Sequence, residues 1–444
     1  MKPGAKIFSA IELLENIWES NTSAPAAIQT YFKLRRFAGS SDRKSIKFLF
    51  YEIIRKRSKL NWWFRQFEPN SNFTPRSAVI VYLILEKKYK EDMMLEFFSN
   101  KLYHPHCLTK TEYRLLKSIA GNTLSHPKMP DFVTGEYPEW LDPTFRNIWG
   151  NKILDETLAL NARAPLDLRV NTLKTSREAL QLDLLKEGLK TSLTPFSPLG
   201  LRANSNTKIT ETIAYKMGKV EIQDEGSQLI SILCNAKPGM RVIDYCAGAG
   251  GKSLAIAAIM KNKGHIMACD ISLARLKKIR ERQKRANIKI ISSKVLSSKN
   301  YETPKRKPKQ ADRVLCDVPC SGTGTWRRQP EKKFNFSEYQ LQQLLKTQRN
   351  ILFHAQHLVK PGGFLIYSTC SVLPQENHEQ ISWFLKTFKN FSIKPINTVS
   401  QEVCLSSGCF AAEYLKLSPA ATNTDGFFCA ILLKMSDSLS PLKA

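Results

Sequence analysis

From about residue 236 onward, short apolar runs alternate with longer amphipathic stretches, and this alternation constrains the fold more than any other feature of the chain. Five runs have the length and composition of buried strands: 241–246, 265–270, 288–293, 313–318 and 363–370. Three stretches of helical periodicity separate them: 253–260, 273–286 and 337–358. Strands that alternate with helices form a doubly wound, largely parallel sheet. The sequence therefore predicts an α/β domain over residues 236–435, with a last edge strand at 426–434.

The net charge of the chain indicates which class of partner it binds. Its 444 residues include 67 Lys and Arg against 39 Asp and Glu, a formal net charge of +28. A surplus of this size is typical of proteins that bind a polyanion, and it favours nucleic acid over a membrane surface. No apolar run approaches the ~20 residues that span a bilayer, so we expect no membrane partner.

The compartment is predicted from the N-terminus and the cysteines. The most apolar part of residues 1–17 contains Glu12 and Glu15, whereas a signal peptide has an uninterrupted apolar run there. The ten cysteines are scattered without CxxC pairs, which argues against a structural zinc site and a disulfide framework. We therefore expect free thiols, no metal and a reducing, cytoplasmic compartment.

The part before residue 236 divides into two predicted regions. Residues 1–125 are expected to be all-α, with a helix at 9–20 whose apolar face is formed by Ile11, Leu14 and Ile17. Asp42 is expected to cap a second helix that runs to residue 63 and carries several basic side chains. That helix is either a core helix with a solvated face or a module that contacts RNA phosphates.

Four prolines between residues 127 and 143 then mark a domain boundary. Residues 126–235 are expected to form a small mixed α+β region, with a strand at 168–171 and a helix at 176–187 that Gly188 ends. In the last part of the chain, a basic run at 305–309 is either a solvated loop or a further RNA contact.

A glycine-rich loop follows the first predicted strand of the α/β domain, with the sequence DYCAGAGGKS at 244–253. Glycines at such a turn let a cofactor approach the backbone and leave helix N–H groups free to bind it. Cys246 stands where a phosphate-binding P-loop needs glycine, and Ser253 stands where the dinucleotide fingerprint needs Gly or Ala. S-adenosylmethionine needs only a short glycine turn, and it is the third candidate. Asp270 ends the second predicted strand, where an acid either accepts hydrogen bonds from a ribose or caps the next helix.

Two further predicted strands end in cysteine motifs, DVPCSGTG at 317–324 and STCS at 368–371. A lone free cysteine is usually a small buried apolar side chain, but ligand sites in parallel sheets lie at the carboxyl ends of the strands. If the two strands are neighbours, they lie ~4.8 Å apart, and the sulfurs of Cys320 and Cys370 can face one pocket.

Methylation at carbon 5 of cytosine requires such a pair of groups. A thiolate that adds to carbon 6 makes carbon 5 nucleophilic enough to take a methyl group, and a second acid–base group then assists release. Asp317 is placed to hold the edge of the pyrimidine. A base that reacts in this way must be unstacked first.

With these motifs the chain resembles the bacterial Sun-type (NOP/Sun) RNA cytosine-5 methyltransferases over nearly its whole length. The resemblance rests on RVN at 169–171, IQDEGSQL at 222–229, CAGAGGKS at 246–253, DVPCSGTG at 317–324 and STCSVLPQEN at 368–377. It implies a Rossmann-like class I S-adenosylmethionine-dependent methyltransferase domain, preceded at 1–125 by an antitermination-factor NusB-like helical domain. It also implies an RNA substrate: small-subunit (16S) ribosomal RNA is expected and transfer RNA is the alternative, with no obligate protein partner.

The resemblance also assigns the site residues. It makes Cys370 the nucleophile and Cys320 the release cysteine, with Asp317 and Lys252 beside them. The methyl donor is expected to bind Cys246, Ala247, Gly248, Ala249, Gly250, Gly251, Lys252, Asp270 and Asp317. The chain departs from the family pattern at Ala249, where proline is usual, and at 292–295, where an acid usually meets the adenine.

Two rival functions are compatible with the same motifs. A DNA cytosine-5 methyltransferase takes its nucleophile from a Pro-Cys motif, which would make Cys320 the attacking residue. A ribosome-assembly factor that binds RNA without catalysis would need no acid near Lys294.

Overall fold

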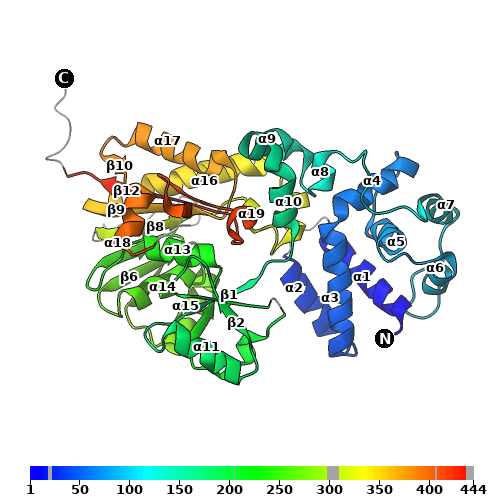
Figure 1. The fold of residues 1–444 in the computed structure, drawn as a ribbon, viewed down its shortest axis with the longest axis horizontal. Coiled ribbons are helices and arrows are strands. Elements are labelled where there is room, and N and C mark those ends of the chain that lie inside the picture. Colours follow the sequence, from blue (N-terminus) through cyan, green and yellow to red (C-terminus); the bar gives the residue numbers. More distant parts are fainter. Residues whose placement is uncertain (19–22, 205, 298–309, 406–407, 437–444) are drawn as a thin grey trace. The chain divides into compact units, whose positions relative to one another are not determined.

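The computed structural model describes residues 1–18, 23–204, 206–297, 310–405 and 408–436 (Figure 1). The basic run at 305–309 lies outside these residues. The chain forms two compact units: Met1–Ala162 with Trp326–Ser337, and Arg163–Thr325 with Glu338–Ala444. The first unit therefore includes a segment from the second half of the sequence. The predicted division at 125 and 235 into three domains stays a prediction.

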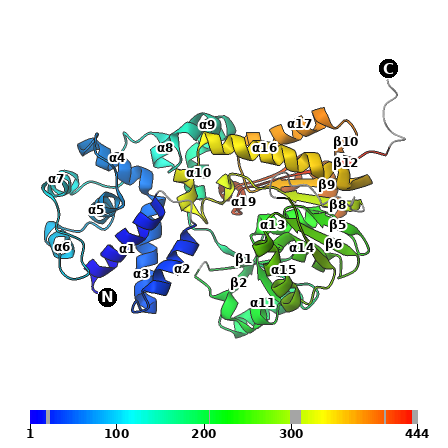
Figure 2. The ribbon, with the colours of Figure 1, turned by 180° about the vertical axis from the view of Figure 1, so that it is seen from behind.

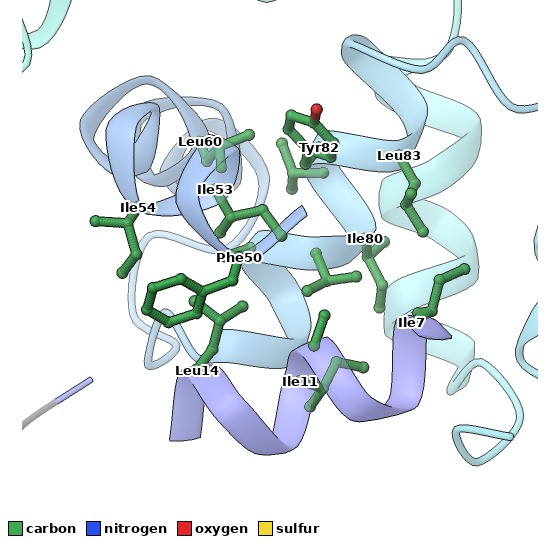
Figure 3. Packing of buried hydrophobic residues seen from close by; sticks show 14 of the residues in the cluster. Ile7, Ile11, Leu14, Phe50, Ile53, Ile54, Leu60, Ile80, Tyr82 and Leu83 are labelled. Carbon is green, nitrogen blue, oxygen red and sulfur yellow. The ribbon is translucent and has the colours of Figure 1, made fainter. Parts of the chain in front are cut away.

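The first unit is helical, as expected (Figure 2). Its helices are α1 Pro3–Trp18, α2 Ala24–Leu34, α3 Ser40–Arg55, α4 Arg57–Phe67, α5 Pro75–Leu85, α6 Glu91–Phe97, α7 Lys110–Ile119, α8 Asp131–Thr134, α9 Asp142–Trp149 and α10 Ile153–Asn161. Every residue of α5 except Arg76 is buried, and Figure 3 shows its side chains packed against those of α1 and α3. The predicted apolar face of α1 is confirmed, because Ile11, Leu14 and Ile17 all lie in this core.

The predicted helix over 42–63 is wrong in two respects. It is two helices, α3 and α4, and Gly39 rather than Asp42 is the N-cap of α3. The Asp42 carboxylate lies in the first turn, where it pairs with Lys6 at 3.0 Å. The second helix starts at Arg57 because the buried Glu136 carboxylate accepts the N–H groups of its first turn, those of Ser58 and Lys59, at 2.8 and 3.1 Å. This cap comes from a distant part of the chain, so no local pattern reveals it.

The second unit contains a small antiparallel sheet with the strand order β2-β3-β1-β4. Its elements are β1 Leu166–Val170, α11 Arg177–Lys186, β2 Thr191–Leu193, β3 Gly200–Ala203, α12 Ile213–Lys216 and β4 Val220–Ile222. The predicted strand and helix are both confirmed here. Ser176 is the N-cap of α11, and Gly188 follows it with a left-handed φ of +80°.

The large sheet has the order β10-β12-β9-β8-β5-β6-β7, and β11 also pairs with β12. Its strands are β5 Arg241–Asp244, β6 His265–Asp270, β7 Ile291–Val295, β8 Ala311–Asp317, β9 Val359–Thr369, β10 Phe391–Ile393, β11 Leu415–Leu417 and β12 Phe427–Lys434. Strands β5 to β9 pair in parallel, whereas β12 is antiparallel to its neighbours. The predicted α/β fold with a largely parallel sheet is confirmed.

One strand lies elsewhere than predicted. The strand at 426–434 is not at the edge, because β12 pairs with β9 on one side and with β10 on the other. Residues 427–432 are all buried, and such a continuous apolar run is typical of a strand covered on both faces.

Helices cover both faces of this sheet (Figures 1 and 2). They are α13 Glu225–Leu233, α14 Gly251–Ile259, α15 Leu273–Ala286, α16 Glu338–Ala355, α17 His378–Thr387, α18 Ile396–Glu402 and α19 Pro419–Thr422. One apolar cluster joins the sheet to α13, α14, α15 and α18, and another joins it to α16 and α17. The strand order reverses between β5 and β8, and the crevice at such a switch point is where doubly wound sheets bind ligands. No helix in the described ranges is both long and apolar enough to cross a membrane.

Candidate active site

The glycine-rich loop leaves β5 and enters α14 through two left-handed residues, Gly248 with φ +55° and Gly250 with φ +79°. A Cβ at Gly250 would lie 2.8 Å from the Ile279 side chain, so only glycine fits between the loop and α15. At Gly248 a Cβ would meet nothing within 4 Å, so space is open in front of the backbone. The loop therefore has the open, glycine-dependent turn that a cofactor needs.

Contacts from neighbouring elements hold this loop in place. The Ala247 N–H donates to the Cys269 carbonyl at 2.8 Å. The Ala249 carbonyl accepts a hydrogen bond from Arg282 of α15 at 2.7 Å, and Arg282 pairs with Glu221 at 2.9 Å. At the position where the family usually has proline, the backbone is thus fixed by a guanidinium group.

Asp270 ends β6 and is 4% exposed. One of its oxygens accepts the Gly248 N–H at 2.9 Å. The other accepts the Ser272 N–H at 2.8 Å and pairs with Arg275 at 2.9 Å. A carboxylate accepts about four hydrogen bonds, so this group holds the loop and retains capacity for one more donor. Its role in ribose binding stays a prediction.

Asp244, at the end of β5, was not among the predicted site residues. Burial raises the pKa of its carboxyl group to about 7. One oxygen accepts the Ser253 hydroxyl at 2.6 Å, whereas Oδ1 has no hydrogen-bond partner in the structure. A buried acceptor without a donor is costly, so a ligand with N–H or O–H groups would stabilise this end of the loop. The thiol of Cys246, two residues later, has a pKa raised well above the usual value by burial.

Cys320 and Cys370 come together as the sequence predicted. They follow the neighbouring strands β8 and β9, in which Asp317 pairs with Ser368. The two Sγ atoms lie 3.4 Å apart, and both thiols are free and partly exposed. The pKa of the Cys320 thiol is raised well above its usual value, first by the hydrogen bond with Cys370 and then by burial. Cys320 therefore keeps its proton at neutral pH and can donate it to the Cys370 sulfur.

Lys252 and Asp317 form an ion pair beside the two thiols. The Lys252 Nζ lies 2.6 Å from Asp317 Oδ2, and the Ser368 hydroxyl donates to Oδ1 at 2.9 Å. Burial lowers the pKa of Lys252, but the charges of Asp317, Asp244 and Cys370 act in the opposite direction and leave it raised. The ion pair with Asp317 therefore fixes an ammonium group within electrostatic reach of the Cys370 sulfur.

A buried polar network joins the two cysteine loops. The Glu376 carboxylate, 0% exposed, accepts the Ser321 N–H at 2.9 Å, the Ser321 hydroxyl and the Gln348 side-chain amide at 2.9 Å. The Ser371 hydroxyl bonds to Ser321 at 3.1 Å and to Thr323 at 3.0 Å. Glu376 lies in the same motif as Cys370, but sequence reasoning gave it no role, because only the fold brings it to Ser321.

A backbone contact completes the arrangement. The Gly324 N–H donates to the Cys370 carbonyl at 3.0 Å, and the Gly324 carbonyl accepts the Gly426 N–H at 2.8 Å. A Cβ at Gly324 would lie 2.1 Å from the Gly426 oxygen. The glycine after the first cysteine motif therefore lets the loop reach both the second motif and the start of β12.

At the end of β7, Val295 pairs in register with Asp270, and residues 292–295 offer no carboxylate. Within residues 292–295, the structure therefore offers no replacement for the acid that usually meets the adenine in the family.

Comparison with known proteins finds similar chains over most of the sequence. Residues 231–433 match the family model described as 16S rRNA methyltransferase RsmB/F, and residues 137–210 match that of an RsmF/B-like ferredoxin-like domain. A Synechocystis protein named probable ribosomal RNA small subunit methyltransferase B is 32% identical over 326 residues, 72% of each chain. The ribosomal RNA small subunit methyltransferase B of Cronobacter sakazakii is 26% identical and covers 96% of this chain and 97% of its own. The crystal structure of PH0851 matches 98% of this chain and 99% of its own, with a TM-score of 0.78 and 26% identity.

Proposed function

Since the chain belongs to the RsmB/F family of 16S rRNA methyltransferases, we propose that it methylates carbon 5 of a cytosine in small-subunit ribosomal RNA. The observation that carries this proposal is the pair of free thiols, 3.4 Å apart, at the ends of two neighbouring parallel strands. Two sulfur groups at one point are what addition to carbon 6 and release from it require. We also propose the cytoplasm as the compartment, because ribosomal RNA would be met there.

The methyl donor of this family is S-adenosylmethionine, and the residues present fit it. The open space at Gly248 admits a ligand to the backbone, and the unpartnered Asp244 oxygen matches a group with N–H donors. We propose that Cys246 to Lys252, Asp270 and Asp317 line its site. When bound, this molecule supplies an electrophilic methyl group on a positively charged sulfur.

The covalent step is assigned to Cys370. Its sulfur adds to carbon 6 of the unstacked cytosine, and the electron pair of the 5,6 double bond becomes available at carbon 5. The Cys320 S–H lies 3.4 Å from the attacking sulfur, and the ion pair with Asp317 holds the Lys252 ammonium group beside the two cysteines. Asp317 has a protein partner on each oxygen and a further lone pair on each, so it can still accept a hydrogen bond from the pyrimidine edge.

Release is assigned to Cys320. Once Cys370 is bonded to carbon 6, Cys320 loses the hydrogen bond that is the first cause of its raised pKa. After alkylation, Cys320 can therefore react as a thiolate and take the proton that carbon 5 still carries. The electron pair of the carbon–hydrogen bond then restores the 5,6 double bond, and the bond from carbon 6 to the Cys370 sulfur breaks. The products are 5-methylcytosine, a Cys370 thiolate that leaves with the electron pair of the broken bond, and a Cys320 thiol that carries the proton from carbon 5.

Single cysteine variants test the assignment. With Cys320→Ala, S-adenosylmethionine and RNA, we expect a covalent protein–RNA adduct that withstands denaturing electrophoresis, because release is blocked. With Cys370→Ala we expect neither adduct nor product. The exposed Cys107, in the helical unit, provides a matched control, since Cys107→Ala should behave as the wild type. The opposite result, an adduct only in Cys370→Ala, would make Cys320 the attacking residue, as in the DNA enzymes.

The substrate is tested in cells. Bisulfite sequencing of total RNA with and without the gene should show one cytosine in small-subunit ribosomal RNA that loses its protection from conversion. A loss confined to transfer RNA would replace the proposed substrate and leave the chemistry intact.

A further inference from the structure

The helical unit contains a cavity of about 590 Å³ that the proposed mechanism does not use. It lies where the end of α1, helix α4 and the start of α5 meet, and it is lined by Trp18, Arg57, Asn61, Arg65, Phe73 and Phe334 among others. Its volume is within the range of about 300–1,000 Å³ typical of small-ligand sites. Apart from Phe334, these residues lie outside the segments that match the two family models.

The lining combines positive charge with aromatic rings. It includes two arginines and three aromatic side chains, and no acidic residue is among the residues that line it. The Arg57 guanidinium group lies 3.8 Å from the centre of the Trp18 ring and 4.9 Å from that of Phe334. Arg65 is exposed and donates a hydrogen bond to the Pro69 carbonyl. A cationic site with ring faces suits a phosphate joined to a flat heterocycle.

A buried acceptor points to the same ligand. The side-chain oxygen of Asn61 is shielded from solvent and has no hydrogen-bond donor in the structure. Buried polar atoms are almost always paired, and an unpaired one costs about 1–3 kcal/mol. Asn61 is among the residues that line the cavity, and a turn of its side-chain amide would present this oxygen to a ligand with an amino or imino N–H. Asparagine is also among the side chains that recognise base edges.

We propose that this cavity binds one unpaired nucleotide of the RNA substrate. The base lies against the partly exposed rings of Phe73 and Phe334 and donates to the Asn61 oxygen, and its phosphate faces Arg65 and Arg57. This inference rests on the proposed function in so far as RNA is the substrate. It adds a second point of contact, in the helical unit, that selects single-stranded RNA.

Two variants test the proposal and leave Arg57, which packs on the Trp18 ring, unchanged. Asn61→Leu has nearly the same volume and removes the unpaired oxygen, so its stability in urea should equal or exceed that of the wild type. Arg65→Ala changes an exposed side chain. Arg114→Ala is the matched control, since Arg114 is an exposed arginine of α7 outside the cavity.

The measurement is fluorescence anisotropy of the full chain with a short labelled single-stranded RNA. Asn61→Leu should raise Kd about five-fold at unchanged net charge. Arg65→Ala should raise Kd and lower the slope of log K against log salt by about 1, while Arg114→Ala should change neither. An RNA with 4-thiouridine should cross-link to the segments around Trp18 or Phe73 in the wild type, and less in Asn61→Leu.

The outcomes separate this inference from the proposed function. If Asn61→Leu and Arg65→Ala bind and cross-link RNA as the Arg114 control does, the cavity takes no nucleotide, whereas methylation is unaffected. If the wild-type chain binds no RNA at all, both the inference and the RNA substrate are wrong. RNA binding could also weaken equally in all three variants, or weaken in the two arginine variants and not in Asn61→Leu. Either result would assign RNA binding to a diffuse basic surface and overturn the proposal that the cavity binds a nucleotide.

Discussion

The buried Glu376 carboxylate provides the sharpest test of how the two cysteine loops are held. It accepts three hydrogen bonds from donors that belong to the Cys320 loop and to α16. In Glu376→Ala, the Ser321 hydroxyl keeps Ser371 as a partner and the Gln348 amide keeps the Pro319 carbonyl. The Ser321 N–H alone loses its acceptor, which costs about 1–3 kcal/mol, and the lost charged bonds and the cavity add a similar amount.

We therefore expect Glu376→Ala to lower the free energy of unfolding by about 3–5 kcal/mol, and Glu376→Gln to lower it by about 1 kcal/mol. Glutamine retains an oxygen for the Ser321 N–H, and the Ser321 hydroxyl can rotate to accept from the new amide. Urea denaturation followed by circular dichroism measures both values. The exposed Glu379, in the first turn of α17, provides the control Glu379→Gln, which should be neutral.

Glu376→Gln also has a chemical consequence. The negative charge of Glu376 raises the pKa of the Cys320 thiol. Removing that charge lowers the pKa, and a lower pKa makes the thiolate available at lower pH. The pH profile of single-turnover product formation should therefore move to lower pH in Glu376→Gln and stay in place in Glu379→Gln. A Glu376→Gln enzyme with wild-type stability and a wild-type pH profile would refute the positioning role.

Three further predictions follow from the site. Lys252→Met removes the charge beside Asp317 and Cys370. When it is combined with Cys320→Ala, adduct formation in quenched single-turnover assays should be about a hundred-fold slower, or more, than with Cys320→Ala alone. An unchanged rate would contradict the role of the ion pair. Gly324→Ala places a methyl group against the Gly426 backbone and should cost about 1–3 kcal/mol in urea with a loss of activity, whereas Gly408→Ala, where nothing lies within 4 Å, should be tolerated. The pKa of Asp244 is raised from 3.8 to about 7, so the folded state binds the extra proton, and stability should fall as pH rises from about 4 through 7. Asp244→Asn should flatten this pH dependence of stability and weaken the binding of S-adenosylmethionine measured by calorimetry. If the wild-type chain binds no S-adenosylmethionine at millimolar concentration, the result would favour the non-catalytic assembly factor.

The sequence predicted the parts of the fold that local periodicity determines. The five strands β5 to β9 and the helices between them follow from alternating apolar patterns, with β7 three residues later than expected. The meeting of Cys320 and Cys370 also followed, because both motifs end parallel strands.

What the sequence could not predict depends on distant contacts. The break between α3 and α4 needs the carboxylate of Glu136, and the interior position of β12 needs the pairing of two strands far apart in the chain. In the site, Glu376 reaches Ser321 across 55 positions, and the unpaired oxygen of Asp244 becomes visible only once its surroundings are packed. Periodicity reports which face of an element is buried, but not which side chain lies opposite.

The return of Trp326–Ser337 to the helical unit limits how this protein can be divided. Trp326 is 2% exposed and Lys333 is 1% exposed, and the Lys333 ammonium group bonds to Asn161 at 2.8 Å. A truncation that deletes residues 1–162 would leave an indole and an ammonium group without their surroundings, in the segment between Cys320 and Cys370. A catalytic fragment made by one cut would thus be prone to aggregation and proteolysis at that loop, and a workable one needs the loop shortened or redesigned as well.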